Sequence, residues 1–323
     1  MRAAIVNHLG SPPRFAERPD PADRPGHTLV RVTAAALNPV DLHIAAGTHP
    51  AGTPAVPYVP GIEAAGTVVS GGPLAPGTRV RVAVPGGFVD GTLAELVSVP
   101  DQACLPVPDG LDDDLAAAVG VVGVSALTAL RDEAGLRPGD SVLVLGATGA
   151  LGQALVHLAR ALGAARVVAA GRTADRLKTL ADTADATLLL DAAADAADPS
   201  RIAAAVAATG GPVDVVADLL WGPHTGVAQA ALGSGGRWVN LGQLAGGTAA
   251  LDAAALRHRH LRLSGFSATA LPADRVAAAY REVADIAARG ALPLTVTAHP
   301  LEDIADLWTA QAASPGGKLV LRP

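Results

Sequence analysis

Residues 141–162 contain the feature that most restricts how this chain can fold. Ser141–Leu145 is a short apolar run, the pattern of a strand buried on both faces. Glycines follow at positions 146, 149 and 152, and leucines at 151, 155, 158 and 162 have the spacing of one helical face. A strand, a glycine turn and a helix in this order open a dinucleotide-binding unit, because the glycines let the backbone approach a pyrophosphate and the helix N–H groups face it. We therefore expect cofactor contacts from Gly146, Ala147, Thr148, Gly149, Ala150, Leu151 and Gly152.

The end of the next predicted strand, Arg166–Ala170, bears on which dinucleotide binds. It lies about 20 residues beyond the glycines, where such units read the ribose, and it is followed by Gly171, Arg172 and Thr173 rather than by an acidic residue. An arginine suits the 2′-phosphate of NADP, and Arg176 lies one helical turn further on. These four residues predict NADPH as the cofactor. The alternative is a solvated arginine at a strand end.

Composition narrows the class of protein. The 323 residues suggest about two domains, and no apolar run of about 18 residues predicts a membrane span. The single cysteine, Cys104, excludes an internal disulfide and fits a reducing compartment, so we expect a cytoplasmic protein. A net charge of −6 with 2% aromatic residues gives no case for nucleic-acid binding.

The chain changes in texture along its length. Up to about residue 115 it is rich in proline and glycine, with short strands typical of a β-barrel. From there to about residue 271 strands alternate with helices, which predicts a doubly wound sheet. The predicted strands are Thr28–Thr33, Ala64–Val69, Arg79–Val84, Ala94–Val99, Ser141–Leu145, Arg166–Ala170, Thr187–Leu190, Val213–Asp218, Arg237–Leu241, Leu261–Gly265 and Lys318–Arg322. The predicted helices are Ala150–Leu162, Ala174–Ala181, Ile202–Ala208, Ala273–Arg289 and Glu302–Ser314.

Several motifs carry a family resemblance that runs nearly from end to end. They occupy residues 37–41, 60–66, 128–130, 235–242 and 316–321. On these motifs the chain resembles the zinc-independent quinone oxidoreductase and enoyl reductase branch of the medium-chain dehydrogenase/reductase superfamily. The resemblance implies a GroES-like catalytic domain made from residues 1–115 and 272–323 and a central Rossmann NADP-binding domain, residues 116–271. It also implies a homodimer that joins the Rossmann sheets through an edge strand, for which residues 261–266 are the candidate.

The resemblance also bears on zinc. Zinc alcohol dehydrogenases of this superfamily place a cysteine where this chain has Asn38 and a histidine where it has Ile62, and the cysteine expected near residues 125–128 is missing. One cysteine cannot build their four-cysteine structural site either. We therefore expect no metal.

Without a metal, hydride transfer to a quinone, an enone or an enoyl thioester is the expected reaction, and the site needs hydrogen-bond donors and a proton source. His43 and His49 stand where relatives carry tyrosine, so either histidine, or water, could deliver the proton. Asn38 is expected near the nicotinamide or the substrate carbonyl, and Thr128 near the nicotinamide. The alternatives are a ribose contact for His43, a loop position for His49, a turn before proline for Asn38 and a buried helix position for Thr128. Asp41 is expected to cap the helix that begins there or to orient His43.

Two further sets of residues are candidates for contacts with the cofactor and with the acceptor. Asn240, Leu241, Gly242, Phe266 and Ser267 come at carboxyl ends of strands, where ligands bind in such sheets, so we expect them to contact the cofactor. The candidates for an apolar, small-molecule acceptor pocket are Phe88, Leu93, Val121, Trp221 and Leu244.

Other functions stay open at this stage. The glycine motif also occurs in short-chain dehydrogenases, but neither Tyr58 nor Tyr280 has the lysine four residues later that such enzymes use. A stand-alone enoyl reductase or other tailoring enzyme of a biosynthetic pathway, such as polyketide synthesis, is the main alternative. A non-enzymatic NADPH-binding protein and an enzyme that uses the fold for non-redox chemistry are the others.

Overall fold

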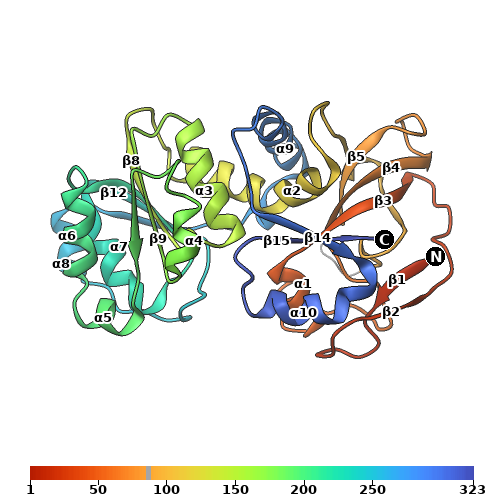
Figure 1. Ribbon diagram of the computed structural model, residues 1–323, viewed down its shortest axis with the longest axis horizontal. Helices are drawn as coiled ribbons and strands as arrows, with labels where there is room; N and C mark the ends of the chain where they lie inside the picture. The colour runs from red at the N-terminus through yellow and green to blue at the C-terminus, as the bar shows by residue number, and fades with distance from the viewer. Residues whose placement is uncertain (85–88) are drawn as a thin grey trace. The chain divides into compact units, whose positions relative to one another are not determined.

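The computed structural model describes residues 1–84 and 89–323, and it divides the chain into two compact units. The terminal unit comprises Met1–Val121, Ala273–Gly290 and Leu294–Pro323, so it contains both ends of the chain (Figure 1). The central unit comprises Val122–Pro272 and Ala291–Pro293. The sequence placed the first boundary after residue 115, whereas the structure places it after Val121, within the helix Asp113–Thr128.

Antiparallel strands dominate the terminal unit. Among the described residues, the larger sheet has the order β14-β15-β3-β4-β5-β7, β6 also pairs with β3, and β1 and β2 form a separate hairpin. The long strand β3 therefore lies at the centre, and its residues Ala35 to Leu37 pair with the last strand of the chain. The strands are β1 Arg2–Ile5, β2 Arg14–Glu17, β3 His27–Leu37, β4 Glu63–Gly71, β5 Arg79–Ala83, β6 Leu96–Pro100, β7 Cys104–Pro106, β14 Val296–Pro300 and β15 Lys318–Arg322.

The terminal unit also contains helices. They are α1 Pro39–Ala45, the beginning of α2 Asp113–Thr128, α9 Ala273–Ala288 and α10 Ile304–Ala312. The core contains small and β-branched side chains from the strands together with Ile304 and Trp308 of α10. Burial of this apolar surface is the main source of stability for such a unit.

Six parallel strands form the sheet of the central unit in the part of the chain that the structure describes. Their order is β10-β9-β8-β11-β12-β13, so the chain reverses direction across the sheet between β8 and β11. All residues of β8 are buried, as its apolar sequence predicts. The strands are β8 Ser141–Leu145, β9 Arg166–Gly171, β10 Ala186–Leu189, β11 Val213–Asp218, β12 Leu232–Asn240 and β13 Arg262–Gly265.

Helices cover both faces of this sheet, with α3 and α4 on one face and α5 to α8 on the other (Figure 1). They are α3 Ala150–Ala161, α4 Ala174–Lys178, α5 Ala192–Ala197, α6 Ser200–Ala208, α7 Thr225–Ala231 and α8 Ala253–His258. Two layers of helix around a doubly wound parallel sheet confirm the predicted Rossmann architecture. The predicted helix 174–181 is shorter than expected and ends at Lys178.

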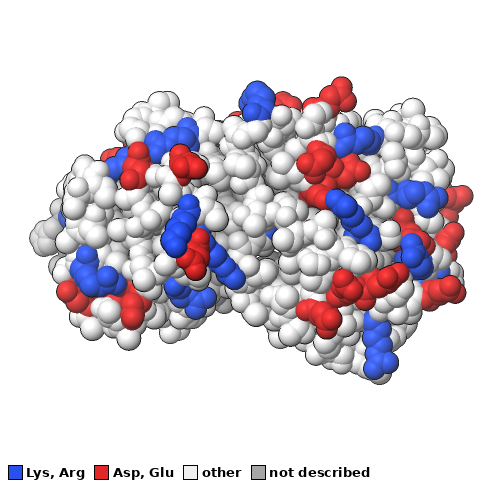
Figure 2. Space-filling model, viewed as in Figure 1, with Lys and Arg blue, Asp and Glu red and all other residues white. Residues whose placement is uncertain are grey.

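One helical stretch is long and apolar enough to cross a membrane. It is Asp113–Glu133, which combines α2 with the π-helical turn Ala129–Glu133 and has a mean hydropathy of 1.5. Since 72% of its apolar window is buried within the folded protein, it has the character of a core helix. On the face shown in Figure 2, acidic and basic side chains are interspersed among uncharged surface, with no continuous basic patch.

Candidate functional site

The turn between β8 and α3 has the conformation that its glycines predict. Gly146 has a φ of +87°, and its N–H and that of Ala147 both donate to the carbonyl oxygen of Ala170 at 2.9 Å. Gly149 precedes the first residue of α3 with an extended backbone (φ −80°, ψ 163°). The free N–H groups of the first turn of α3 therefore lie at the carboxyl end of β8, as an anion-binding helix start requires.

Gly149 and Gly152 differ in what their missing side chains make room for. A Cβ on Gly152 would lie 2.2 Å from the carbonyl oxygen of Gly146, so this glycine is required for the close packing of α3 on the turn. A Cβ on Gly149 would lie 3.8 Å from the nearest protein atom, again the oxygen of Gly146. The fold itself does not require glycine at position 149, which leaves approach by a ligand as the physical reason for it.

The end of β9 carries the residues predicted to read the ribose phosphate. Arg172, Thr173 and Arg176 are exposed, and in the described part of the chain no carboxylate pairs with Arg172. The nearby Asp175 pairs with Lys178 at 2.7 Å. Gly171 allows a close approach, since a Cβ there would lie 2.9 Å from the side-chain methyl of Thr148.

The residues after β12 and β13 form a hydrogen-bonded edge at the carboxyl end of the sheet. Asn240 donates from Nδ2 to the carbonyl oxygen of Gly242 at 2.8 Å, and the N–H of Phe266 donates to the oxygen of Asn240 at 2.9 Å. Leu241 donates its N–H to the oxygen of Asp218 at 2.7 Å. Ser267 lies next in the chain, and its hydroxyl is 2.8 Å from that of Thr269. The structure thus brings these predicted residues to the same sheet edge as the glycine turn.

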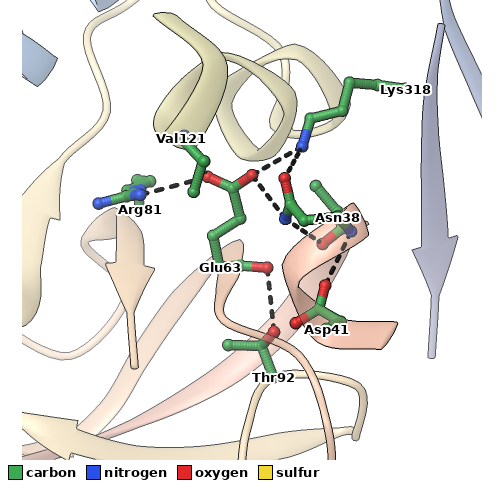
Figure 3. Close-up of polar contacts among 8 residues, drawn as sticks. Asn38, Asp41, Glu63, Arg81, Thr92, Val121 and Lys318 are labelled. Atoms are coloured by element: carbon green, nitrogen blue, oxygen red, sulfur yellow. Dashed lines mark hydrogen bonds and ion pairs between the residues drawn. The ribbon is translucent and has the colours of Figure 1, made fainter. Parts of the chain in front are cut away.

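A buried polar cluster, which the sequence did not predict, occupies the terminal unit (Figure 3). At its centre is Glu63, the first residue of β4, whose side chain is fully buried. Its Oε1 accepts from Lys318 Nζ at 2.9 Å and from Asn38 Nδ2 at 3.0 Å. Its Oε2 accepts from the N–H of Val121 at 2.6 Å and from Arg81 Nη2 at 3.2 Å. We call Glu63, Arg81, Lys318 and Asn38 the Glu63 cluster.

Small residues and a tyrosine complete the surroundings of the Glu63 cluster. Gly120 of α2 allows the close approach, since a Cβ there would lie 2.2 Å from Glu63 Oε2. The Arg81 guanidinium lies 5.2 Å from the ring centroid of Tyr280 in α9, an arrangement typical of a cation–π contact. Both cations are only 3% exposed, so the buried carboxylate of Glu63 is compensated by two buried positive charges.

Asn38 is engaged inside this cluster. It is 2% exposed, its Nδ2 donates to Glu63 and to the carbonyl oxygen of Ala36, and its Oδ1 accepts a short hydrogen bond from Lys318. The expected contact to a nicotinamide or a substrate carbonyl would have to compete with these partners. A catalytic role for Asn38 stays a prediction, and its position at the start of α1 agrees with the turn-forming alternative.

Asp41 caps α1 in a buried setting. Its Oδ2 accepts from the backbone N–H of Asn38 at 2.7 Å, which is the capping role that the sequence favoured. Its Oδ1 is buried and has no hydrogen-bond partner within the described residues. Burial raises the pKa of Asp41 to about 7, although the Asn38 N–H and the charge of Lys318 oppose this effect.

The two candidate histidines follow each other along one short segment. His43, near the end of α1, is exposed, and its Nδ1 lies 3.4 Å from Thr48 Oγ1. His49 is half-buried, and its Nδ1 accepts from the N–H of Ala51 at 3.2 Å. This hydrogen bond assigns the proton of the neutral His49 ring to Nε2.

Thr128 lies at the end of α2 and is fully buried. Its hydroxyl donates to the carbonyl oxygen of Val124 at 2.6 Å, so its proton is used within the helix. This geometry agrees with the buried helix position, and contact with a nicotinamide stays a prediction.

Four of the five pocket candidates lie within the described residues, in different environments. Phe88 lies outside the described residues, and Leu93 is fully buried in the core of the terminal unit. Val121 donates its N–H to Glu63 of the Glu63 cluster. Trp221 is half-buried and Leu244 is 71% exposed, and both lie in loops at the carboxyl edge of the central sheet.

A search of the described residues for metal-ligand groups finds no set of three or more His, Cys, Asp or Glu side chains that could hold a metal. The position where zinc relatives would carry a ligand, Asn38, is hydrogen-bonded to a lysine and a glutamate instead.

Comparison with known proteins gives matches over both units. The model of the alcohol dehydrogenase GroES-like domain matches residues 24–109, and that of the zinc-binding dehydrogenase domain matches residues 150–288. Quinone oxidoreductase of Rattus norvegicus is 37% identical over 172 residues, which cover 50% of this chain and 50% of that protein. The chain thus spans about half the length of the curated relatives it matches.

Two further relatives extend the match. A component of the pikromycin polyketide synthase of Streptomyces venezuelae, PikAII, is 34% identical over 225 residues, covering 68% of this chain and 6% of that protein. The structure of quinone oxidoreductase from Thermus thermophilus, also solved as a complex with NADPH, is 31% identical and superposes with a TM-score of 0.80 over 100% of both chains. The chain therefore belongs to the medium-chain dehydrogenase/reductase superfamily, among its quinone oxidoreductase-like oxidoreductases.

Proposed function

We propose that this protein is an NADPH-dependent oxidoreductase that transfers hydride to a quinone or to an activated C=C bond, such as that of an enone, without zinc. The observation that carries the proposal is the glycine turn of the central unit. There Gly149 is open to a ligand while Gly152 is closed by packing, as a dinucleotide-binding turn needs. The relatives named quinone oxidoreductase support the reaction class.

The residues of the central unit fit NADPH. The N–H groups at the start of α3 would hold the pyrophosphate, and Arg172 and Thr173 at the end of β9 would hold the 2′-phosphate. Asn240 to Gly242, Phe266 and Ser267 would line the path of the nicotinamide half. The end of β9 carries no acidic residue that would repel the phosphate, and the nearby Asp175 pairs with Lys178.

When bound, the reduced nicotinamide supplies the hydride. Reduction of an enone leaves negative charge on the substrate oxygen, which needs a hydrogen-bond donor and then a proton. We assign proton delivery to Nε2 of His49, since its Nδ1 accepts from the N–H of Ala51, with His43 and water as the other sources. The absence of a zinc ligand at Asn38 supports acceptors that need no Lewis acid.

An enoyl reductase of a biosynthetic pathway is the second candidate. The similarity to PikAII, which covers 68% of this chain, favours it. The two candidates differ in the acceptor, a quinone in the first and an enoyl thioester in the second. NADPH oxidation measured against a panel of quinones, enones and enoyl thioesters separates them by the ratio of kcat/KM values. Failure to oxidise NADPH with any of the three acceptor classes would refute both.

The cofactor is tested by Arg172→Ala, with Arg257→Ala as the matched control. Arg257 is an exposed arginine of the same unit, in α8 and outside the cofactor residues. A hydrogen bond to a charged group contributes about 1.5–3 kcal/mol, so Arg172→Ala should raise the Kd for NADPH about 10- to 100-fold and leave that for NADH nearly unchanged. Equal affinity of the wild type for NADH and NADPH in a fluorescence titration would refute the cofactor assignment.

We also propose a cytoplasmic homodimer that pairs through β13. This strand is the last of the central sheet, and Leu263 on it is 37% exposed. An uncovered edge strand invites pairing with another chain, which a second copy would satisfy. Light scattering at micromolar concentration should give twice the chain mass of 32.0 kDa, and a monomer would contradict the proposal.

A further inference from the structure

The turn after β11 contains a backbone conformation that only glycine adopts easily. Trp221 has φ 56° and ψ −153°, and Gly222 follows with φ 57°. Strain of this kind persists only where the surrounding structure imposes it, and it gathers at ligand-binding sites. Contacts of the surrounding residues must therefore hold Trp221 in this conformation.

Asp218 and Trp238 hold the strained turn. The buried Oδ1 of Asp218 accepts from the N–H groups of Leu220 at 2.8 Å and Trp221 at 3.0 Å. Its Oδ2 accepts from the indole N–H of Trp238 at 3.2 Å. The two indole rings pack with centroids 5.5 Å apart, so the Trp221 ring anchors the turn to the sheet.

The turn after β11 also holds the loop after β12 in place. Ala245 donates its N–H to the oxygen of Leu220 at 2.8 Å, and Trp221 forms a parallel bridge with Gly246. On the other side, Leu219 and Leu220 lie against the glycine turn, since a Cβ on Gly146 would be 3.1 and 3.2 Å from them. The Trp221 turn thus fixes a continuous surface from the glycine turn to residues 241–246.

The order of the strands indicates which half of a dinucleotide would contact this surface. The pyrophosphate binds after β8, and the adenosine half extends over β9, where Arg172 lies. The other half extends across the reversal point, over β11 and β12. Trp221 and residues 241–246 follow these two strands.

We propose that Trp221 is a positioning residue for the nicotinamide-riboside half of NADPH, acting by locking the β11 turn and the β12 loop into one preformed surface. The proposal rests on the proposed function, because it takes NADPH as the ligand of the glycine turn. It concerns binding of one half of the cofactor, and so it can fail while NADPH binding stands.

Calorimetric titration with whole NADPH and with 2′,5′-ADP, which carries only the adenosine half, tests the proposal. Trp221→Ala should raise the Kd for NADPH about tenfold, equivalent to about 1.4 kcal/mol, and change that for 2′,5′-ADP less than about twofold. Arg172→Ala should weaken both ligands. Trp221→Phe, which keeps a ring to pack on Trp238, should restore most of the NADPH affinity.

His260→Gly is the matched control. His260 also has a positive φ, 52°, in the same unit, but it precedes β13 and so lies at the amino edge of the parallel sheet. This variant should bind both ligands as the wild type does. Unchanged NADPH affinity in Trp221→Ala, or equal weakening of both ligands, would overturn the proposal. A wild type that binds neither ligand would overturn the proposed function and the inference with it.

Discussion

Replacement of Glu63 by glutamine should destabilise the terminal unit more than any other change of one charge in the Glu63 cluster. The Glu63 carboxylate accepts four hydrogen bonds, two at each oxygen. A glutamine amide has one accepting oxygen and one donating NH2 group. Whichever way the amide turns, its NH2 group faces two N–H donors, and both buried cations lose their carboxylate partner.

The size of the effect follows from burial. Removing one partner of a buried ion pair costs about 3–5 kcal/mol, and the cations here are only 3% exposed, so we expect a loss in this range. Since 1 kcal/mol shifts the Tm of a domain of this size by about 2–4 °C, Glu63→Gln should lower the Tm by about 6–20 °C. Circular dichroism during heating, together with urea unfolding, measures the change.

Two variants act as controls for Glu63→Gln. Lys318→Met removes one cation but leaves Glu63 paired with Arg81, so it should destabilise less. Glu302→Gln makes the same chemical change at a 60% exposed carboxylate that pairs with Arg2 at 3.6 Å, and it should alter stability by less than about 0.5 kcal/mol. If Lys318→Met lowers the free energy of unfolding as much as Glu63→Gln does, the inference that Glu63 compensates both buried cations is wrong.

Three further changes test other parts of the structure. Because burial raises the pKa of Asp41 to about 7, the native state binds this proton more tightly than the unfolded state, so stability should fall as pH rises from about 4 to 7. Asp41→Asn should flatten this fall in urea titrations, and an unchanged pH dependence would refute the assignment. Gly152→Ala should lower the Tm, because its Cβ would lie 2.2 Å from the carbonyl oxygen of Gly146. Gly149→Ala should leave the Tm unchanged and weaken NADPH binding. A lower Tm in both variants would contradict the different roles of the two glycines. His49→Phe should reduce turnover of an enone by about 100-fold with little change in the Kd for NADPH, and wild-type turnover would leave His49 as a loop residue.

The sequence predicted the central unit well because its signals are local. Two predicted strands of this unit, Ser141–Leu145 and Val213–Asp218, have the bounds observed, as does Lys318–Arg322 in the terminal unit. Each is a short run dominated by apolar residues, so hydrophobic pattern alone marks its extent. β12 begins at Leu232, earlier than the predicted Arg237, because its first residues include three glycines that look like a turn in sequence.

The Glu63 cluster was missed because its members are far apart in sequence. Glu63 and Lys318 are separated by 255 residues, and no local pattern joins them. A signal was nevertheless present. Glu63 directly precedes the predicted strand Ala64–Val69 and Lys318 begins the predicted strand Lys318–Arg322, and charges beside such small or apolar residues are buried only when paired. The sequence did not predict the strain at Trp221, because a tryptophan in the turn after a strand is no indication of a positive φ.

The position of β15 has a consequence for the order in which the chain can fold during its synthesis. The central unit is almost continuous, so it can complete its sheet once residue 272 has left the ribosome. The terminal unit cannot, because the strand that pairs with residues 35–37 and the ammonium group that meets Glu63 both come from residues 318–322. Until then β3 has an open edge and Glu63 lacks one of its two cations. A chain that stops short of Lys318 therefore keeps an incomplete terminal unit, which quality-control proteases can recognise.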